Sequence, residues 1–175
     1  MKKSRRLSET CRRMYLEGRM DEDFVMKAVT ETLGGECVRA SREDDMFKHI
    51  DFYWQSPKKG IIAIDVKGIK KNKRSDDNKD DSIHWIEMKN VRGNDGWVYG
   101  KSDYIAFLTK KQILFVKLDT LRKFAEEKVK DKELVFENPK EFYIPYQRKK
   151  YGRLDMTFKC PISDLIELSE FSIDY

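Results

Sequence analysis

The sequence predicts a single α/β domain in which helices flank a central mixed sheet. Three observations carry this prediction. An amphipathic helical pattern near the N-terminus is followed by several apolar runs of strand length. Turns that contain glycine or proline separate these runs, and a second and a third helical pattern follow. No repeat or linker divides the chain, and 175 residues suffice for one domain with a sizeable core.

The composition of the chain limits the classes of protein to which it can belong. Hydrophobic residues make up 39% of the chain and charged residues 38%, so a core can form beneath a strongly charged surface. The net charge of +5 permits a nucleic-acid partner without requiring one. No apolar run approaches the roughly 20 residues that span a bilayer, so no membrane partner is expected. Three widely spaced cysteines and two histidines argue against structural zinc and favour reduced thiols in a cytoplasmic protein.

The chain begins with a basic segment and a helix. Residues 1–19 hold seven lysines or arginines, and we expect a loose basic arm or a short helix there. Acidic residues at 21–23 suit the start of a helix, and apolar residues at helical spacing continue it to Leu33. A glycine pair then ends the helix. We therefore expect one domain over 20–175, preceded by the basic arm.

A β-hairpin is predicted next. A short strand over 36–41 and a polar loop lead to apolar runs over 49–54 and 61–67, joined by a turn with proline and glycine. The charged stretch 68–82 has a basic first half and an acidic second half. Because it holds almost nothing apolar, it cannot bury enough surface to order itself, and we predict a mobile loop.

Further strands and two helices complete the predicted domain. Residues 131–153 are polar and basic with scattered aromatic side chains, so we expect mostly irregular structure there. Apolar runs and turn signals predict strands over 84–91, 104–108, 112–118 and 154–159, and helical spacing predicts helices over 121–129 and 164–168.

Two aspartates and a lysine interrupt the apolar strands of the hairpin. Asp51 lies near the start of the first strand, and Asp65 and Lys67 lie at the end of the second. Residues two apart in a strand share a face, so Asp65 and Lys67 project together, and strand pairing brings Asp51 beside Asp65. Adjacent carboxylates stay ionised together only with a cation between them, and Mg²⁺ suits such a site, with Mn²⁺ as an alternative. A lysine beside a metal-bound water would orient that water, so the pattern predicts hydrolysis of a phosphodiester.

The spacing from Asp51 to Asp65-Val66-Lys67, behind an acidic amphipathic helix, resembles the PD-(D/E)XK nuclease superfamily. That superfamily includes restriction endonucleases, Holliday-junction resolvases and many phage-encoded nucleases. The resemblance covers roughly residues 20–130 and implies a restriction-endonuclease-like αβββαβ core. It implies a metal-dependent nuclease that acts on DNA, and the size of the chain fits a phage-encoded protein. No proline precedes Asp51 here, which departs from the family pattern.

The resemblance also assigns roles to residues. It implies that Asp51 and Asp65 bind the metal, that the carbonyl of Val66 is a further ligand, and that Lys67 is the catalytic lysine. The sequence does not rank branched, duplex and single-stranded DNA as substrates. It also does not rank DNA against RNA. A monomer and a homodimer fit the charge of the chain equally.

Two assignments stay open. In many members of the superfamily a glutamate on the first helix completes the site. Glu22 is our choice because it shares a face with apolar residues of the helix, and Asp21 is the rival. A second acid-x-lysine pattern, Glu87-x-Lys89, lies on a later strand and competes with Asp65-x-Lys67. It needs an upstream aspartate on a neighbouring strand.

Other residues are candidates for contact with nucleic acid. Lysines and arginines that follow the hairpin would contact phosphates, and an aromatic–basic segment after a glycine turn would stack on bases. The simpler readings are a solvated loop and aromatic rings that cover a sheet edge. His49 and His84 are expected to be surface or packing residues rather than proton carriers. The candidates for nucleic-acid binding are Lys70, Lys71, Lys73, Arg74, Trp97 and Lys101.

A second function fits the same fold. A non-catalytic nucleic-acid-binding protein, or a virion or assembly component, would share the architecture and the mild positive charge. The clustered acids argue against it, because burying two carboxylates together is costly unless they hold a cation.

Overall fold

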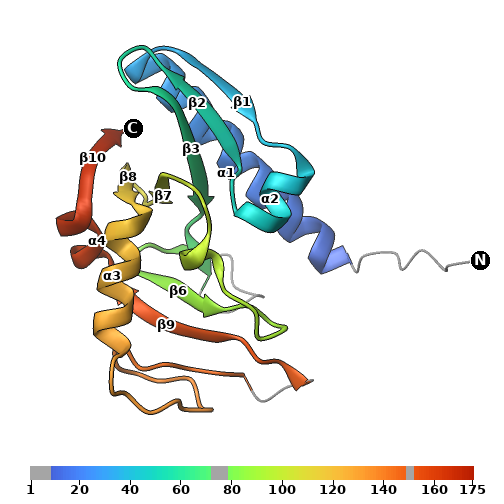
Figure 1. The fold of residues 1–175 in the computed structure, drawn as a ribbon, viewed down its shortest axis with the longest axis vertical. Helices are drawn as coiled ribbons and strands as arrows, with labels where there is room; N and C mark the ends of the chain where they lie inside the picture. The colour runs from blue at the N-terminus through green and yellow to red at the C-terminus, as the bar shows by residue number, and fades with distance from the viewer. Residues whose placement is uncertain (1–8, 72–78, 149–151) are drawn as a thin grey trace, which may run out of the picture.

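The computed structural model describes residues 9–71, 79–148 and 152–175 (Figure 1). The first half of the chain forms α1 (Glu9–Leu33), β1 (Glu36–Arg39), α2 (Arg42–Lys48), β2 (Phe52–Ser56), β3 (Gly60–Lys67), β4 (Lys70–Lys71) and β5 (Lys79–Asp80). The second half forms β6 (Ile83–Lys89), the 3-10 helix η1 (Trp97–Tyr99), β7 (Tyr104–Leu108), β8 (Gln112–Lys117), α3 (Leu118–Val129), β9 (Met156–Pro161), α4 (Ile162–Leu168) and β10 (Ser169–Asp174). None of the described helices is long and apolar enough to cross a membrane.

The predicted mixed central sheet is confirmed. Six strands lie in the order β1-β2-β3-β7-β8-β10, and β3 and β7 are the parallel neighbours. All other pairs are antiparallel, and β1, β2 and β3 form a meander. β6 and β9 pair in a separate two-stranded sheet.

The connection from β3 to β7 differs from the αβββαβ order. Parallel neighbours require a crossover, and in that order a helix makes it. The described part of this connection, 68–71 and 79–103, holds β4, β5, β6 and η1 but no α-helix. β6 therefore lies, paired with β9, in the layer where the predicted core has a helix.

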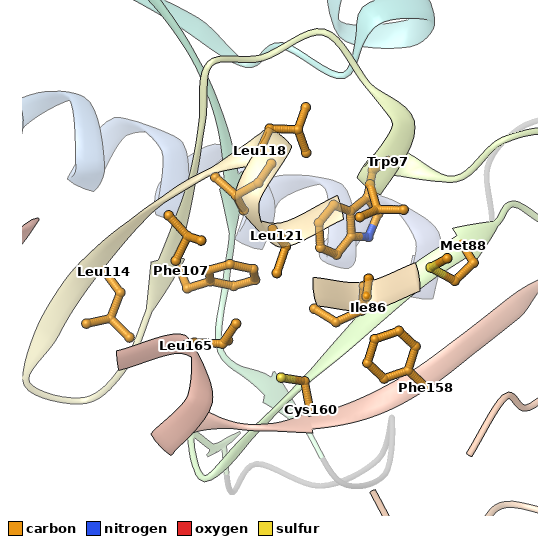
Figure 2. Close-up of a cluster of buried hydrophobic side chains, with 14 residues drawn as sticks. Ile86, Met88, Trp97, Phe107, Leu114, Leu118, Leu121, Phe158, Cys160 and Leu165 are labelled. Carbon is orange, nitrogen blue, oxygen red and sulfur yellow. The ribbon is translucent and has the colours of Figure 1, made fainter. Parts of the chain in front are cut away.

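Buried side chains cover both faces of the six-stranded sheet. α1 packs on one face, against side chains that alternate along β2, β3, β7 and β8. The other face is covered by α3, α4, η1 and the β6–β9 sheet, and Figure 2 shows this second cluster around Phe107. Since every residue of β7 is buried, that strand reads in the sequence as an unbroken apolar run.

α1 ends where the glycine pair predicts but begins earlier than expected. Gly34 and Gly35 have φ angles of +73° and +82°, the left-handed conformation that ends helices. A Cβ on Gly35 would lie 2.1 Å from the carbonyl oxygen of Gln55, so the close approach of α1 to β2 also requires glycine. Residues 9–19, assigned to the basic arm from sequence, are the first turns of α1.

Other boundaries also differ from the sequence prediction. Residues 42–48, expected as a polar loop, form α2, and the strand predicted from residue 49 begins only at Phe52. The cause is His49, which ends α2 with a φ of 54° and so cannot belong to an extended strand. The strand β10 was not expected, since four of its six residues are polar and its pairing with β8 depends on tertiary structure.

Candidate active site

The pairing of β2 with β3 brings the two predicted aspartates together. Phe52 pairs with Ile64, and the Asp51 N–H donates a hydrogen bond of 2.9 Å to the Ile64 carbonyl, so Asp51 lies directly before the paired residues of β2. Asp65 faces away from α1, since the adjacent Ile64 points toward it, and the Asp51 carboxylate is close enough to raise the pKa of Asp65. The Asp51 carboxylate accepts a hydrogen bond of 2.7 Å from the Val66 N–H. The N–H and C=O of one strand residue point to the same edge, so the Val66 carbonyl also lies on the Asp51 side.

The carboxyl group of Asp65 is almost fully buried, with 2% of the residue exposed. Its Oδ1 accepts a hydrogen bond of 2.6 Å from Lys67 Nζ, whereas its Oδ2 has no hydrogen-bond partner among the described residues. Burial raises the pKa of Asp65 to about 8, opposed by the Lys67 ammonium and assisted by the Asp51 carboxylate. At neutral pH this carboxyl therefore retains a proton that a bound cation would displace.

Lys67 is held between the carboxyl group of Asp65 and an aromatic ring. Its ammonium lies 4.8 Å from the centroid of the Trp97 ring. Trp97 is 8% exposed and lies in the second core cluster, 6.1 Å from the Phe107 ring (Figure 2). These contacts fix the Lys67 ammonium beside the acids. The predicted stacking of Trp97 on bases does not fit this position, because its ring is buried.

Glu22 approaches the acid pair from α1, but two arginines hold its carboxylate. Its Oε2 accepts hydrogen bonds of 2.8 Å from Arg19 and 2.5 Å from Arg39. Burial raises the pKa of Glu22 and so does the Asp51 carboxylate, while both arginines lower it. Glu22 is therefore within electrostatic reach of Asp51, although its oxygens are paired elsewhere.

The rival, Asp21, lies beside the residue that directly follows Lys67. A Cβ on Gly68 would lie 2.0 Å from Asp21 Oδ2, so the side chain of Asp21 packs on the backbone that follows β3. Asp21 Oδ1 lies 4.0 Å from Lys79 Nζ of β5. Both candidates on α1 therefore lie close to the strand end that carries Asp65 and Lys67 or to Asp51 itself.

The sequence prediction missed α2, which places two more titratable groups at the site. Ser41 caps this helix by accepting a hydrogen bond of 3.1 Å from the N–H three residues on. Its Ser-x-x-Asp pattern is the signal that marks such a helix start. Desolvation, followed by Lys67, lowers the pKa of His49, and desolvation together with Asp51 raises the pKa of Asp45. Both side chains therefore lie within electrostatic reach of the acid pair.

The structure describes only some of the residues that were predicted to contact nucleic acid. Lys101 is exposed, and its N–H donates a hydrogen bond of 2.8 Å to the last carbonyl of α2, which places it on the rim of the site. Lys70 and Lys71 form β4, where only the backbone is described. Lys73 and Arg74 lie outside the described residues.

The competing pair, Glu87 and Lys89, belongs to the other sheet. β6 pairs with β9, which contains no acid, and Glu87 lies opposite Thr157. His84 on the same strand is 1% exposed, with its Nε2 3.2 Å from the Leu108 carbonyl oxygen, so it is a packing residue as expected.

The oxygens of the site suit a hard divalent cation. Asp51, Asp65 and the Val66 carbonyl supply oxygen donors at adjacent strand ends, and Mg²⁺ is typically held by one or two carboxylates with waters and phosphate. Within the described ranges, no three or more His, Cys, Asp or Glu side chains are arranged to hold a metal. A cation would stabilise the ionised form of Asp65, since burial opposes its ionisation and its Oδ2 has no hydrogen-bond partner in the described ranges.

Comparisons with known proteins add no family to these observations. No protein-family model, no curated protein and no solved structure matches the chain.

Proposed function

We propose that the protein is a magnesium-dependent nuclease that hydrolyses phosphodiester bonds in DNA, with Mn²⁺ as an alternative cation. The observation that supports this most is the grouping of Asp51, Asp65 and Lys67 at the ends of two adjacent strands. A bound Mg²⁺ would supply an activated water at neutral pH and stabilise charge on the phosphate.

The residues of the chain have distinct roles in this proposal. Asp51 and Asp65 bind the cation through oxygens on one face of the sheet, and the Val66 N–H orients Asp51. Lys67, positioned by Asp65 and Trp97, donates hydrogen bonds to the attacking water and to the phosphate oxygens. Attack of the water at phosphorus breaks the bond to the leaving sugar oxygen, which takes up a proton.

One observation favours the alternative, a non-catalytic nucleic-acid-binding or assembly protein. The carboxylate of Glu22 is paired with Arg19 and Arg39, so two acids rather than three face one another. In the nuclease, Glu22 either leaves these arginines when the cation enters or remains outside the metal site. The two functions differ in whether DNA is cut.

A cleavage assay with matched variants tests the proposal. Supercoiled, linear and branched DNA are incubated with the protein in Mg²⁺, Mn²⁺ or chelator. We expect cutting with either metal and none in chelator. Asp51→Asn should abolish cutting, since the amide cannot supply the negative charge, and Glu87→Gln on β6 should cut at the wild-type rate.

Two outcomes would contradict this assignment. Absence of metal-dependent cutting on every DNA would favour the non-catalytic alternative. Loss of cutting in Glu87→Gln, with cutting retained in Asp51→Asn, would move the site to β6.

A further inference from the structure

The β6–β9 sheet has an outer face that the six-stranded sheet does not cover (Figure 1). Along β6, His84, Ile86 and Met88 are buried in the second core cluster or beside it. Trp85 and Glu87 lie between them and so face away from the core, and Lys89, after a shift of register at this end of β6, is exposed. The outer face thus carries a tryptophan and a lysine from one strand.

A second aromatic ring lies beside this tryptophan. Tyr146 pairs with Thr157 of β9, and its ring centroid lies 6.1 Å from that of Trp85, with the planes at 44°. Both rings are partly exposed. The other two tryptophans of the chain, Trp54 and Trp97, are 6% and 8% exposed. Trp85 is therefore the tryptophan that is available to a partner.

Positive charge surrounds the two rings. Lys159 Nζ lies 5.5 Å from the Trp85 ring centroid, and Lys89 and Arg148 are exposed. Residues 143–160 hold five lysines or arginines against one aspartate, a net +4 within a chain of net +5. That aspartate, Asp155, is 3% exposed and lies 3.4 Å from Arg148 Nε and 3.5 Å from an Arg153 nitrogen, so it partly compensates these two arginines. One acid, Glu87, lies in the outward row of β6.

We propose that this outer face, formed by Trp85, Lys89, Tyr146, Arg148 and Lys159, binds a single-stranded stretch of nucleic acid. Bases stack on the two rings while the cations contact phosphates, which is the combination that single-strand-binding surfaces use. A single strand fits better than a duplex, because duplex bases cover one another's faces and leave only edges and phosphates to a protein. The inference rests on the proposed function, since it names the form of nucleic acid that the nuclease would hold.

Fluorescence of Trp85 tests the proposal without metal or cutting. The full chain is titrated in chelator with an oligothymidine and, separately, with a duplex of equal length. We expect the single strand to quench the emission and to bind more tightly than the duplex. Trp85→Ala should weaken single-strand binding about 5- to 150-fold, measured by anisotropy of a labelled oligonucleotide, since one base loses its stacking partner.

Matched variants separate stacking from folding and from general charge. Trp85→Phe keeps an aromatic ring, so it should retain most of the affinity while losing the quenching. Lys89→Ala should weaken binding, whereas Lys110→Ala, which removes an exposed lysine from the β7–β8 turn, should not. A thermal melt of each variant shows whether it folds.

The outcomes distinguish this inference from the nuclease proposal. Unchanged affinity in Trp85→Ala, or tighter binding of duplex than of single strand, would overturn the inference even if DNA is cut. Quenching by the single strand in a protein that cuts no DNA would support the outer face while the nuclease proposal fails.

Discussion

Replacing Lys67 by methionine is expected to slow DNA cutting by roughly 10²- to 10³-fold, the range found for removal of one hydrogen-bond donor that stabilises the transition state. The ammonium lies 2.6 Å from Asp65 Oδ1 and 4.8 Å from the Trp97 ring, so no other described lysine can replace it without moving these partners. Methionine keeps the unbranched stem that packs near Trp97 and removes only the charge. The single-turnover rate at saturating Mn²⁺ measures the effect.

Lys110→Met is the matched control for Lys67→Met. Lys110 is exposed and ion-paired with Asp81 at 3.4 Å, so its loss should leave the cutting rate unchanged. Equal rates for wild type and Lys67→Met would exclude Lys67 from the chemistry, even if the two aspartates still bind metal.

Asp65→Asn is expected to make the metal-free protein more stable at high pH while abolishing cutting. The pKa of Asp65 rises from 3.8 to about 8 on folding, chiefly through burial. Between pH 3.8 and about pH 8, the folded protein therefore holds a proton that the unfolded chain has lost. The free energy of unfolding therefore falls as pH rises through this window and stays low above it. Asparagine has no charge to bury, so the variant should exceed wild type at pH 9 by on the order of 3 kcal/mol or more.

Thermal melts in chelator between pH 6 and pH 9 measure this difference. We expect the gain in melting temperature of Asp65→Asn to widen with pH, reaching about 10 °C. Glu170→Gln is a control of opposite sign. Hydrogen bonds, of which the one from Lys117 has the largest effect, lower the pKa of Glu170 to about 2. Loss of the Glu170 charge should therefore destabilise the protein throughout this pH range, by at most about 1 kcal/mol because the group is exposed. A variant Asp65→Asn that is less stable than wild type at every pH would contradict the account.

The strands that carry the site could be predicted because their patterns are local. β2 and β3 are apolar runs joined by a turn with proline and glycine, and the pleat alone places Asp65 and Lys67 on one face. The pairing of β2 with β3 followed from the hairpin turn. This pairing brings Asp51 close enough to Asp65 for the two carboxyl groups to interact, as the spacing along the hairpin predicts.

Elements that depend on tertiary contacts could not be predicted in the same way. α2 has no buried residue, so no apolar stripe marks it, and only its Ser41 cap gives a signal. Trp97 follows a glycine turn typical of exposed loops, yet its ring fills the core beside Phe107. β6 carries an alternating pattern that fits any sheet, and nothing local indicates that its partner is β9, about 70 residues later.

Calorimetric titration of Mn²⁺ into the protein at pH 7, in two buffers of different ionisation enthalpy, tests most directly whether Asp51 and Asp65 hold a cation. We expect one bound Mn²⁺ and release of about one proton, because Asp65, with a pKa of about 8, must lose its proton to bind metal. Asp51→Asn should not bind, and any residual binding by Asp65→Asn should release no proton. Binding by Asp51→Asn and Asp65→Asn with wild-type affinity, or no binding by the wild type, would contradict the account.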